Sequence, residues 1–129
     1  MRGYSVATAA LALGVQSKWL DNLLSHYRVD GVTQSRQGVA RRLGPGALHV
    51  IATAHRLNQE LQIPVGTALQ LAHELWRSPQ GPDEVDTATV GNGELELHLD
   101  RARIRAHVAA AVAEALEMAP RPKRGRPPK

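Results

Sequence analysis

The chain has 129 residues and a net charge of +4, a length that corresponds to one domain with a short appended element. Apolar residues make up 43% of it and aromatic residues only 3%, with no Phe, so a core must consist of aliphatic side chains and Ala, which favour helices. The absence of Cys excludes disulfides, thiolate metal sites and a cysteine nucleophile.

Charge is unevenly divided along the chain. Residues 1–78 carry 8 Lys and Arg against 4 Asp and Glu, residues 79–120 carry 3 against 8, and residues 121–129 carry 5 against none. DNA phosphates would attract the two basic parts and repel the acidic middle. Neither a signal peptide nor an apolar run of about 20 residues is apparent, so we expect a cytoplasmic, nucleoid-associated protein without membrane contact.

The amino-terminal residues predict two short helices joined by a tight turn. Ser5 can cap a helix that extends to residue 13, and Gly14 can end it in the left-handed conformation. A second helix is expected to start at residue 16 or 17 and run to about residue 27. Its apolar face comprises Leu20, Leu23 and Leu24.

The helical period is lost over residues 29–43, where two short strands, 32–34 and 39–43, are expected with Gly38 near the turn. Pro45 suits the first position of a third helix, expected to reach about residue 62. A fourth helix is expected over residues 65–77. The side chains expected to be buried in these two helices are Leu48, Ile51, Ala54, Leu57, Leu61, Leu69, Ala72, Leu75 and Trp76.

Residues 78–84 have the composition of a linker, and the segment after it predicts a hairpin and a helix. Residues 94–99 alternate polar and apolar side chains, and they can pair with residues 87–90 across an Asn-Gly turn. Asp100 caps a helix over 101–118, whose expected buried stripe is Ile104, Val108, Ala111, Val112, Ala115 and Leu116. A hairpin and one helix cannot bury these faces alone. We therefore predict that residues 79–119 mediate homodimerisation, the alternative being a lid on their own chain.

The carboxyl-terminal tail, residues 120–129, is too rich in Pro, Gly and basic residues to build a core, and is expected to be disordered when free. Its sequence resembles the AT-hook, whose centre is Arg-Gly-Arg-Pro. Gly125 lets the backbone approach the floor of a narrow minor groove, where Arg124 and Arg126 would extend in opposite directions. The residues predicted to bind A·T-rich DNA are Lys123, Arg124, Gly125, Arg126, Pro127 and Lys129.

Residues 4–77 resemble the winged helix-turn-helix domain of MerR-type regulators. The resemblance rests on Tyr4-Ser5-Val6-Ala7, on Leu13-Gly14-Val15 followed by Lys18 and Leu20, and on Arg41-Arg42-Leu43-Gly44-Pro45. It implies that the second helix enters the major groove of double-stranded DNA and that a β wing touches the flanking backbone. The long dimerisation helix and metal-binding Cys of the metal sensors are missing, so no cofactor or metal is expected.

By position, the resemblance assigns DNA contacts to Ser17, Lys18 and Asn22 of the recognition helix and to Arg36, Arg41 and Arg42 of the wing. Lys18 could reach a phosphate or a guanine edge, and Asn22 an adenine edge, whereas the wing arginines would hold phosphates. Asp21 would repel phosphate unless it pairs with a neighbour or accepts from a cytosine amino group. Trp19 is expected to pack between this helix and the wing.

The expected fold is mostly α, with a small β wing and a hairpin: a winged helix-turn-helix domain over 1–78, a hairpin-and-helix segment over 79–119 and a basic tail. The expected function is a bacterial-type transcription regulator. The alternatives are a nucleoid-associated architectural protein and an excisionase-like recombination accessory factor. An enzyme is not expected, because no acid/base pair, nucleophile or phosphate-binding loop is apparent, and no small-molecule effector is evident.

Overall fold

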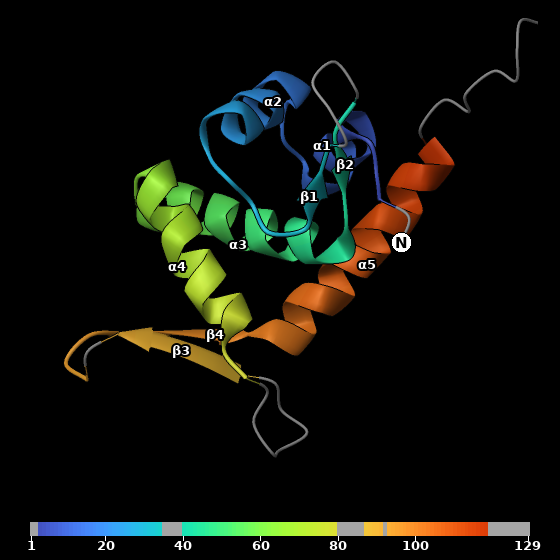
Figure 1. Ribbon diagram of the computed structural model, residues 1–129. Coiled ribbons are helices and arrows are strands. Elements are labelled where there is room, and N and C mark those ends of the chain that lie inside the picture. Colours follow the sequence, from blue (N-terminus) through green and yellow to red (C-terminus); the bar gives the residue numbers. More distant parts are fainter. Residues whose placement is uncertain (1–2, 35–39, 80–86, 92, 119–129) are drawn as a thin grey trace, which may run out of the picture.

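The structure is a computed structural model that describes residues 3–34, 40–79, 87–91 and 93–118 (Figure 1). These residues are mostly helical and include two small antiparallel hairpins, as expected. The elements in chain order are α1 (Val6–Leu13), α2 (Ser17–His26), β1 (Val32–Thr33), β2 (Arg42–Leu43), α3 (Pro45–Leu61), α4 (Val65–Arg77), β3 (Thr87–Gly91), β4 (Glu96–Asp100) and α5 (Arg101–Met118).

The helix ends follow local sequence signals. The Ser5 hydroxyl accepts a hydrogen bond from the Thr8 backbone N–H at 3.1 Å and so caps α1. Gly14 ends that helix with φ of 70°, a left-handed conformation that glycine adopts without strain. At α5, an Asp100 carboxylate oxygen accepts from the Arg103 backbone N–H at 3.1 Å. These three caps confirm the sequence predictions at both ends of the chain.

The strand pair β1–β2 is shorter than the two predicted strands. Val32 lies opposite Leu43 and Thr33 opposite Arg42. Tyr4 extends the pair, because its N–H donates to the Leu43 carbonyl at 2.7 Å and its carbonyl accepts from the Leu43 N–H at 2.8 Å. The start of the chain is thereby attached to β2. The predicted wing turn, with Arg36 and Gly38, lies outside the described residues.

One aliphatic core joins α1, α2, α3, α4 and α5. The helix α5 lies across α1 and α3 (Figure 1) and contributes Ile104, Val108 and Val112 to the same cluster as Leu20, Leu48 and Ile51. Its apolar stripe is therefore covered by its own chain, which was the alternative to dimerisation for this helix. Two predictions of burial were wrong. Leu61, the last residue of α3, is 54% exposed, and Leu116 is 55% exposed because it lies one position beyond the buried stripe of α5 that ends at Ala115.

The hairpin β3–β4 projects past the end of α4 (Figure 1). Ala88 lies opposite Leu99 and Val90 opposite Leu97, so the apolar side chains share one face. Ala88, near the base, is buried. At the other end, Gly91 has φ of 150°, and a Cβ there would collide with the Leu95 backbone, so only glycine fits this turn.

Sequence reasoning missed a buried arginine at the junction of β4 and α5. Arg101 is only 3% exposed. Its Nη1 donates to the backbone carbonyls of Leu75 at 3.0 Å and Ser78 at 2.7 Å, at the carboxyl end of α4. A cation there also complements the negative end of the helix dipole. Arg101 therefore attaches α5 to α4. None of the described helices has the length and apolar character that crossing a membrane requires.

Candidate nucleic-acid interface

The helix α2 has one buried and one exposed face. Leu20, Leu23 and Leu24 anchor it in the core. The opposite face is exposed and consists of polar or charged side chains at helical spacing: Ser17, Lys18, Asp21, Asn22 and Ser25. The structure thus places the three predicted recognition residues, Ser17, Lys18 and Asn22, on one exposed surface.

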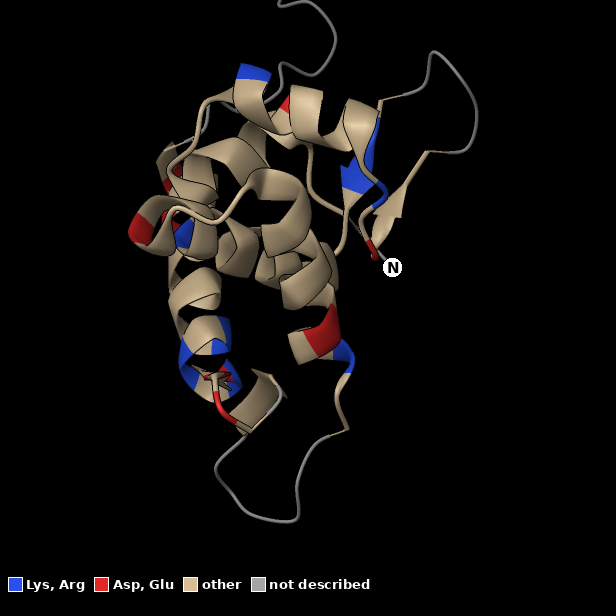
Figure 2. Cartoon of the chain, turned by 90° about the vertical axis from the view of Figure 1, so that its left-hand side faces the viewer, with Lys and Arg blue, Asp and Glu red and all other residues tan. Residues whose placement is uncertain are grey.

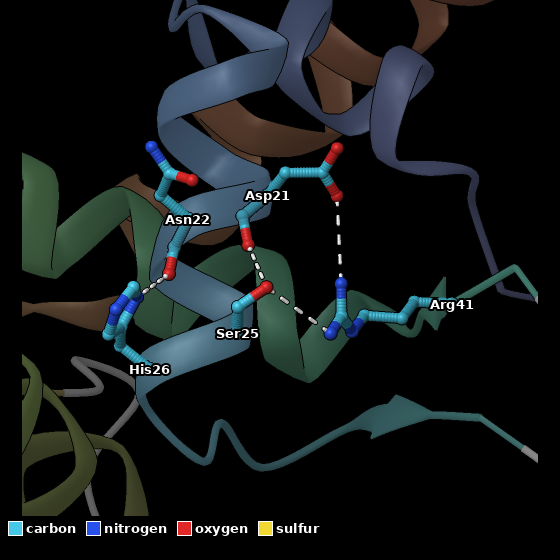
Figure 3. A network of polar contacts seen from close by, with 5 residues as sticks. All are labelled: Asp21, Asn22, Ser25, His26 and Arg41. Atoms are coloured by element: carbon cyan, nitrogen blue, oxygen red, sulfur yellow. Dashed lines mark hydrogen bonds and ion pairs between the residues drawn. The ribbon is translucent and has the colours of Figure 1, made fainter. Parts of the chain in front are cut away.

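Asp21 forms an ion pair with Arg41, which directly precedes β2 (Figure 3). The Arg41 Nη1 lies 3.6 Å from the Asp21 carboxylate, and its Nη2 donates to the Ser25 hydroxyl at 3.4 Å. The Ser25 hydroxyl in turn donates to the Asp21 backbone carbonyl at 2.9 Å. This network offsets the acidic charge on the exposed face of α2. It also connects α2 with the segment that leads into β2.

Asn22 lies beside this network, and its side-chain amide points away from Arg41 (Figure 3). The Asn22 backbone carbonyl accepts a hydrogen bond at 2.7 Å from the ring Nδ1 of His26, which carries the proton in that arrangement. Asn22 itself is exposed, so its side-chain amide lies at the surface. An amide presented in this way can pair with both polar atoms of an adenine edge.

The basic residues beside α2 differ in how they are held. Basic positions occur on both α2 and β2 at this end of the molecule (Figure 2). Arg42 on β2 is exposed, and its Nη2 donates to the Gly3 carbonyl at 2.6 Å. Arg28, just after α2, is also exposed and was not singled out by the sequence. Arg36, the remaining predicted wing residue, lies outside the described residues.

Trp19 contacts α3, and the wing turn against which the sequence predicted it to pack lies outside the described residues. The Trp19 ring meets the His55 imidazole of α3 edge-on, with ring centroids 5.3 Å apart. Trp19 is half-buried against the core. This contact helps to hold α2 against α3, beside the leucines that bury the other face of α2.

Trp76 has a comparable role between α4 and α3. Its ring stacks on His49 with centroids 4.8 Å apart, and its Nε1 donates to the Thr53 hydroxyl at 2.8 Å. Burial lowers the pKa of His49, and the nearby Arg105 guanidinium lowers it further. The neutral imidazole is thus favoured in this stack. Within the described part of the chain, no three His, Cys, Asp or Glu residues gather as a metal site would require.

The predicted AT-hook residues, 123–127 and 129, lie outside the described residues. No protein-family model matches the chain, and neither does any curated protein or solved structure. The functional argument therefore rests on the surface of α2, on its basic neighbours and on the sequence of the tail.

Proposed function

We propose that this protein is a DNA-binding transcription regulator that inserts α2 into the major groove. The observation that carries the proposal is the exposed face of α2, on which Ser17, Lys18 and Asn22 stand together while its leucines lie in the core. A helix of 10 residues is about 15 Å long, and the major groove is about 12 Å wide. A helix of this length can place one face against several successive base pairs.

The order of elements agrees with a winged helix-turn-helix. The helices α1 and α2 are joined by a turn at Gly14, and the pair β1–β2 follows directly. In such domains the second helix reads bases and the wing approaches the flanking phosphates. Arg42 and Arg28 have the exposure that phosphate contacts require, and Arg36 belongs to the predicted wing turn.

The Asp21–Arg41 pair bears on how specific this surface would be. Because Asp21 is paired, its carboxylate does not add an uncompensated negative charge facing the phosphates. Because Arg41 is paired with Asp21, it attracts DNA phosphates less strongly than an unpaired arginine would. We infer that discrimination between sequences falls mainly to Lys18 and Asn22, which can pair with base edges.

The tail would add a second, minor-groove contact. A short A·T-seeking segment tethered to the domain raises the local concentration of each DNA-binding part near the other's site. In the proposed complex, α2 occupies the major groove and residues 121–129 occupy nearby A·T-rich minor groove. The tail supplies A·T preference, and α2 supplies choice of sequence.

The first test combines selection of duplexes from a random pool with binding measurements on the selected sequence. Asn22→Ala is expected to weaken binding to that sequence by about tenfold or more, because a bidentate amide–adenine contact contributes about 1–3 kcal/mol of discrimination. Its affinity for scrambled duplex should change little. Lys18→Ala should weaken binding to both duplexes if Lys18 contacts phosphate, or mainly to the selected one if it contacts guanine.

Gln59→Ala is the matched control, since Gln59 is an exposed amide residue on α3 rather than α2. It should leave both affinities unchanged. Failure to enrich any sequence, with uniform coating of A·T-rich duplex, would instead favour the architectural alternative. Absence of binding to any duplex at low salt would refute the proposal.

A further inference from the structure

A groove runs between α3, β4 and α5, on elements that the proposed DNA contact does not use. Two adjoining hollows of about 430 and 360 Å³ share Arg56, Leu99 and Ile104 as lining residues. The floor is aliphatic and consists of Leu57, Leu61, Leu97, Leu99 and Ile104. The exposure of Leu61, contrary to its expected burial, is explained by its position in this open groove.

The α5 end of the groove is lined by polar and charged side chains, of which Arg103 is exposed. Arg56, Arg103 and His107 line it there, with Asp100 as the acidic lining residue. The Asp100 carboxylate is already engaged by the α5 backbone. At the other end, Glu60 is paired with Arg56 at 3.1 Å, and His98 contacts Thr89 at 3.0 Å. The groove therefore suits a segment that combines a large apolar side chain with carboxylates.

The end of the β3–β4 hairpin is such a segment. Leu95 is 80% exposed, the largest exposed fraction among the described large apolar side chains. It is flanked in sequence by Glu94 and Glu96, which are also exposed. A strand rises about 3.3 Å per residue, so Leu95 lies about 13 Å along the chain from Leu99, which lines the groove of the same copy. The hairpin forms a wall of its own groove and cannot also fill it.

We propose that the groove is the docking site for the hairpin end of a second copy of this chain. In a symmetric dimer, Leu95 of each copy enters the aliphatic hollow of the other, and Glu96 approaches Arg103 across the interface. The exchange is reciprocal, because every copy carries both a groove and a hairpin end. This gives the predicted homodimer an interface made by the hairpin, while the stripe of α5 remains within its own chain.

The test measures self-association of the full chain without DNA, by sedimentation equilibrium over a concentration series. Leu95→Ser is expected to raise the dimer Kd about 100-fold. The symmetric dimer contains two Leu95 contacts, and the loss of each raises the Kd about tenfold. Leu116→Ser is the matched control, since Leu116 is an exposed leucine on α5 outside the groove. It should leave the Kd unchanged. Because Leu95 is exposed in the single chain, thermal melts recorded well below the dimer Kd should be the same for both variants and the unmodified protein.

A charge exchange tests the orientation of the hairpin end. Glu96→Lys and Arg103→Glu should each weaken the dimer, and the double variant should recover most of the loss. A monomeric unmodified protein at the highest concentration reached would overturn the proposal, as would equal effects of the two serine variants. If the dimer Kd of the double variant is as high as that of the more weakly associating single variant, the Glu96–Arg103 contact is overturned. Since no DNA is present, none of these results bears on the proposed function of α2.

Discussion

At the scale of single residues, the role of Arg101 becomes clear only from the groups that it contacts in the folded chain. Its guanidinium lies under the end of α4 and donates to carbonyls that have no partner within that helix. Burial of a charge is tolerated when hydrogen bonds replace its hydration. Arg101 therefore stabilises the junction between β4, α5 and α4.

Arg101→Met is expected to lower the free energy of unfolding by about 2–4 kcal/mol, because hydrogen bonds made by a buried charged group are lost and two carbonyls are left without partners. Chemical denaturation monitored by circular dichroism measures this loss. Arg28→Met, a substitution of an exposed arginine just after α2, should stay within about 0.5 kcal/mol of the unmodified protein. Equal effects of the two substitutions would contradict this role of Arg101.

His73 on α4 is a second residue defined by its contacts. Its Nε2 accepts the Asp30 backbone N–H at 3.1 Å, which requires that this ring nitrogen carry no proton. Burial lowers the pKa of His73 from its ordinary value of 6.5, and Arg77 lowers it further. The Asp30 carboxylate and a hydrogen bond that the ring donates to the Leu69 backbone partly oppose the shift in pKa. The folded protein thus favours the neutral imidazole.

The unfolded chain therefore binds a proton at His73 more readily than the folded one. This contribution to stability is complete above the unfolded value near 6.5, and it is lost as the pH falls from there through the lower folded pKa. Thermal melts from about pH 8 to about pH 5 should show the loss. His73→Gln keeps an acceptor but does not titrate, so its loss on acidification should be smaller. His49 and His55, whose pKa values are also lowered by burial, remain in both proteins. Parallel pH profiles would contradict this role of His73.

At the scale of elements, α2 and the tail suit different kinds of DNA contact. The helix α2 is held by its leucines, by the Trp19–His55 contact and by the Asp21–Arg41 pair, so its exposed face is presented in a fixed orientation. The tail sequence has prolines that favour extended backbone and a glycine between two arginines. A fixed face suits base reading, whereas an extended basic segment suits a narrow groove.

Replacing Arg124 and Arg126 together by Ala should reduce affinity for A·T-flanked sites far more than for G·C-flanked sites, because the G amino group obstructs the minor-groove contact. Fluorescence anisotropy with the two matched duplexes measures both. Deleting residues 121–129 should in addition flatten the salt dependence of binding, since fewer counterions are released. Equal losses on both duplexes would reduce the tail to a sequence-independent phosphate contact.

At the scale of the whole molecule, the amino-terminal and carboxyl-terminal halves share one core. The expected domain of residues 1–78 relies on α5 for part of its apolar cover and on Arg101 for the end of α4. Burying Ile104, Val108 and Val112 contributes about 1.5–3 kcal/mol each, against a total stability of about 5–15 kcal/mol for typical domains. The halves are therefore structurally interdependent.

A chain ending at Ser78 is accordingly expected to lose its cooperative thermal transition and to bind a dye for exposed apolar surface. The sequence alone had suggested that residues 1–78 form a domain of their own. A chain ending at Met118 is the control and should retain the transition. A cooperative melt of the shorter chain, within a few degrees of the control, would show that residues 1–78 form an independent domain.

Much of the fold could be predicted from the sequence, because helix and strand ends depend on neighbouring residues. Ser5, Gly14 and Asp100 act as caps within a few residues of themselves. The spacing of Leu20, Leu23 and Leu24 likewise defined the buried face of α2, and thereby the exposed face with Ser17, Lys18 and Asn22. The tail motif is also local, since it consists of adjacent residues.

The remaining features depend on contacts between residues far apart in the chain, which local patterns do not encode. The pairing of Asp21 with Arg41, the burial of Arg101 and the packing of Trp19 on His55 are of this kind. The periodicity of α5 predicted an apolar stripe but not its partner, because a helix face of this kind can pack on its own chain or on another. Tertiary packing alone decided that α5 covers its own core, and it left Leu61 and Leu95 at the surface.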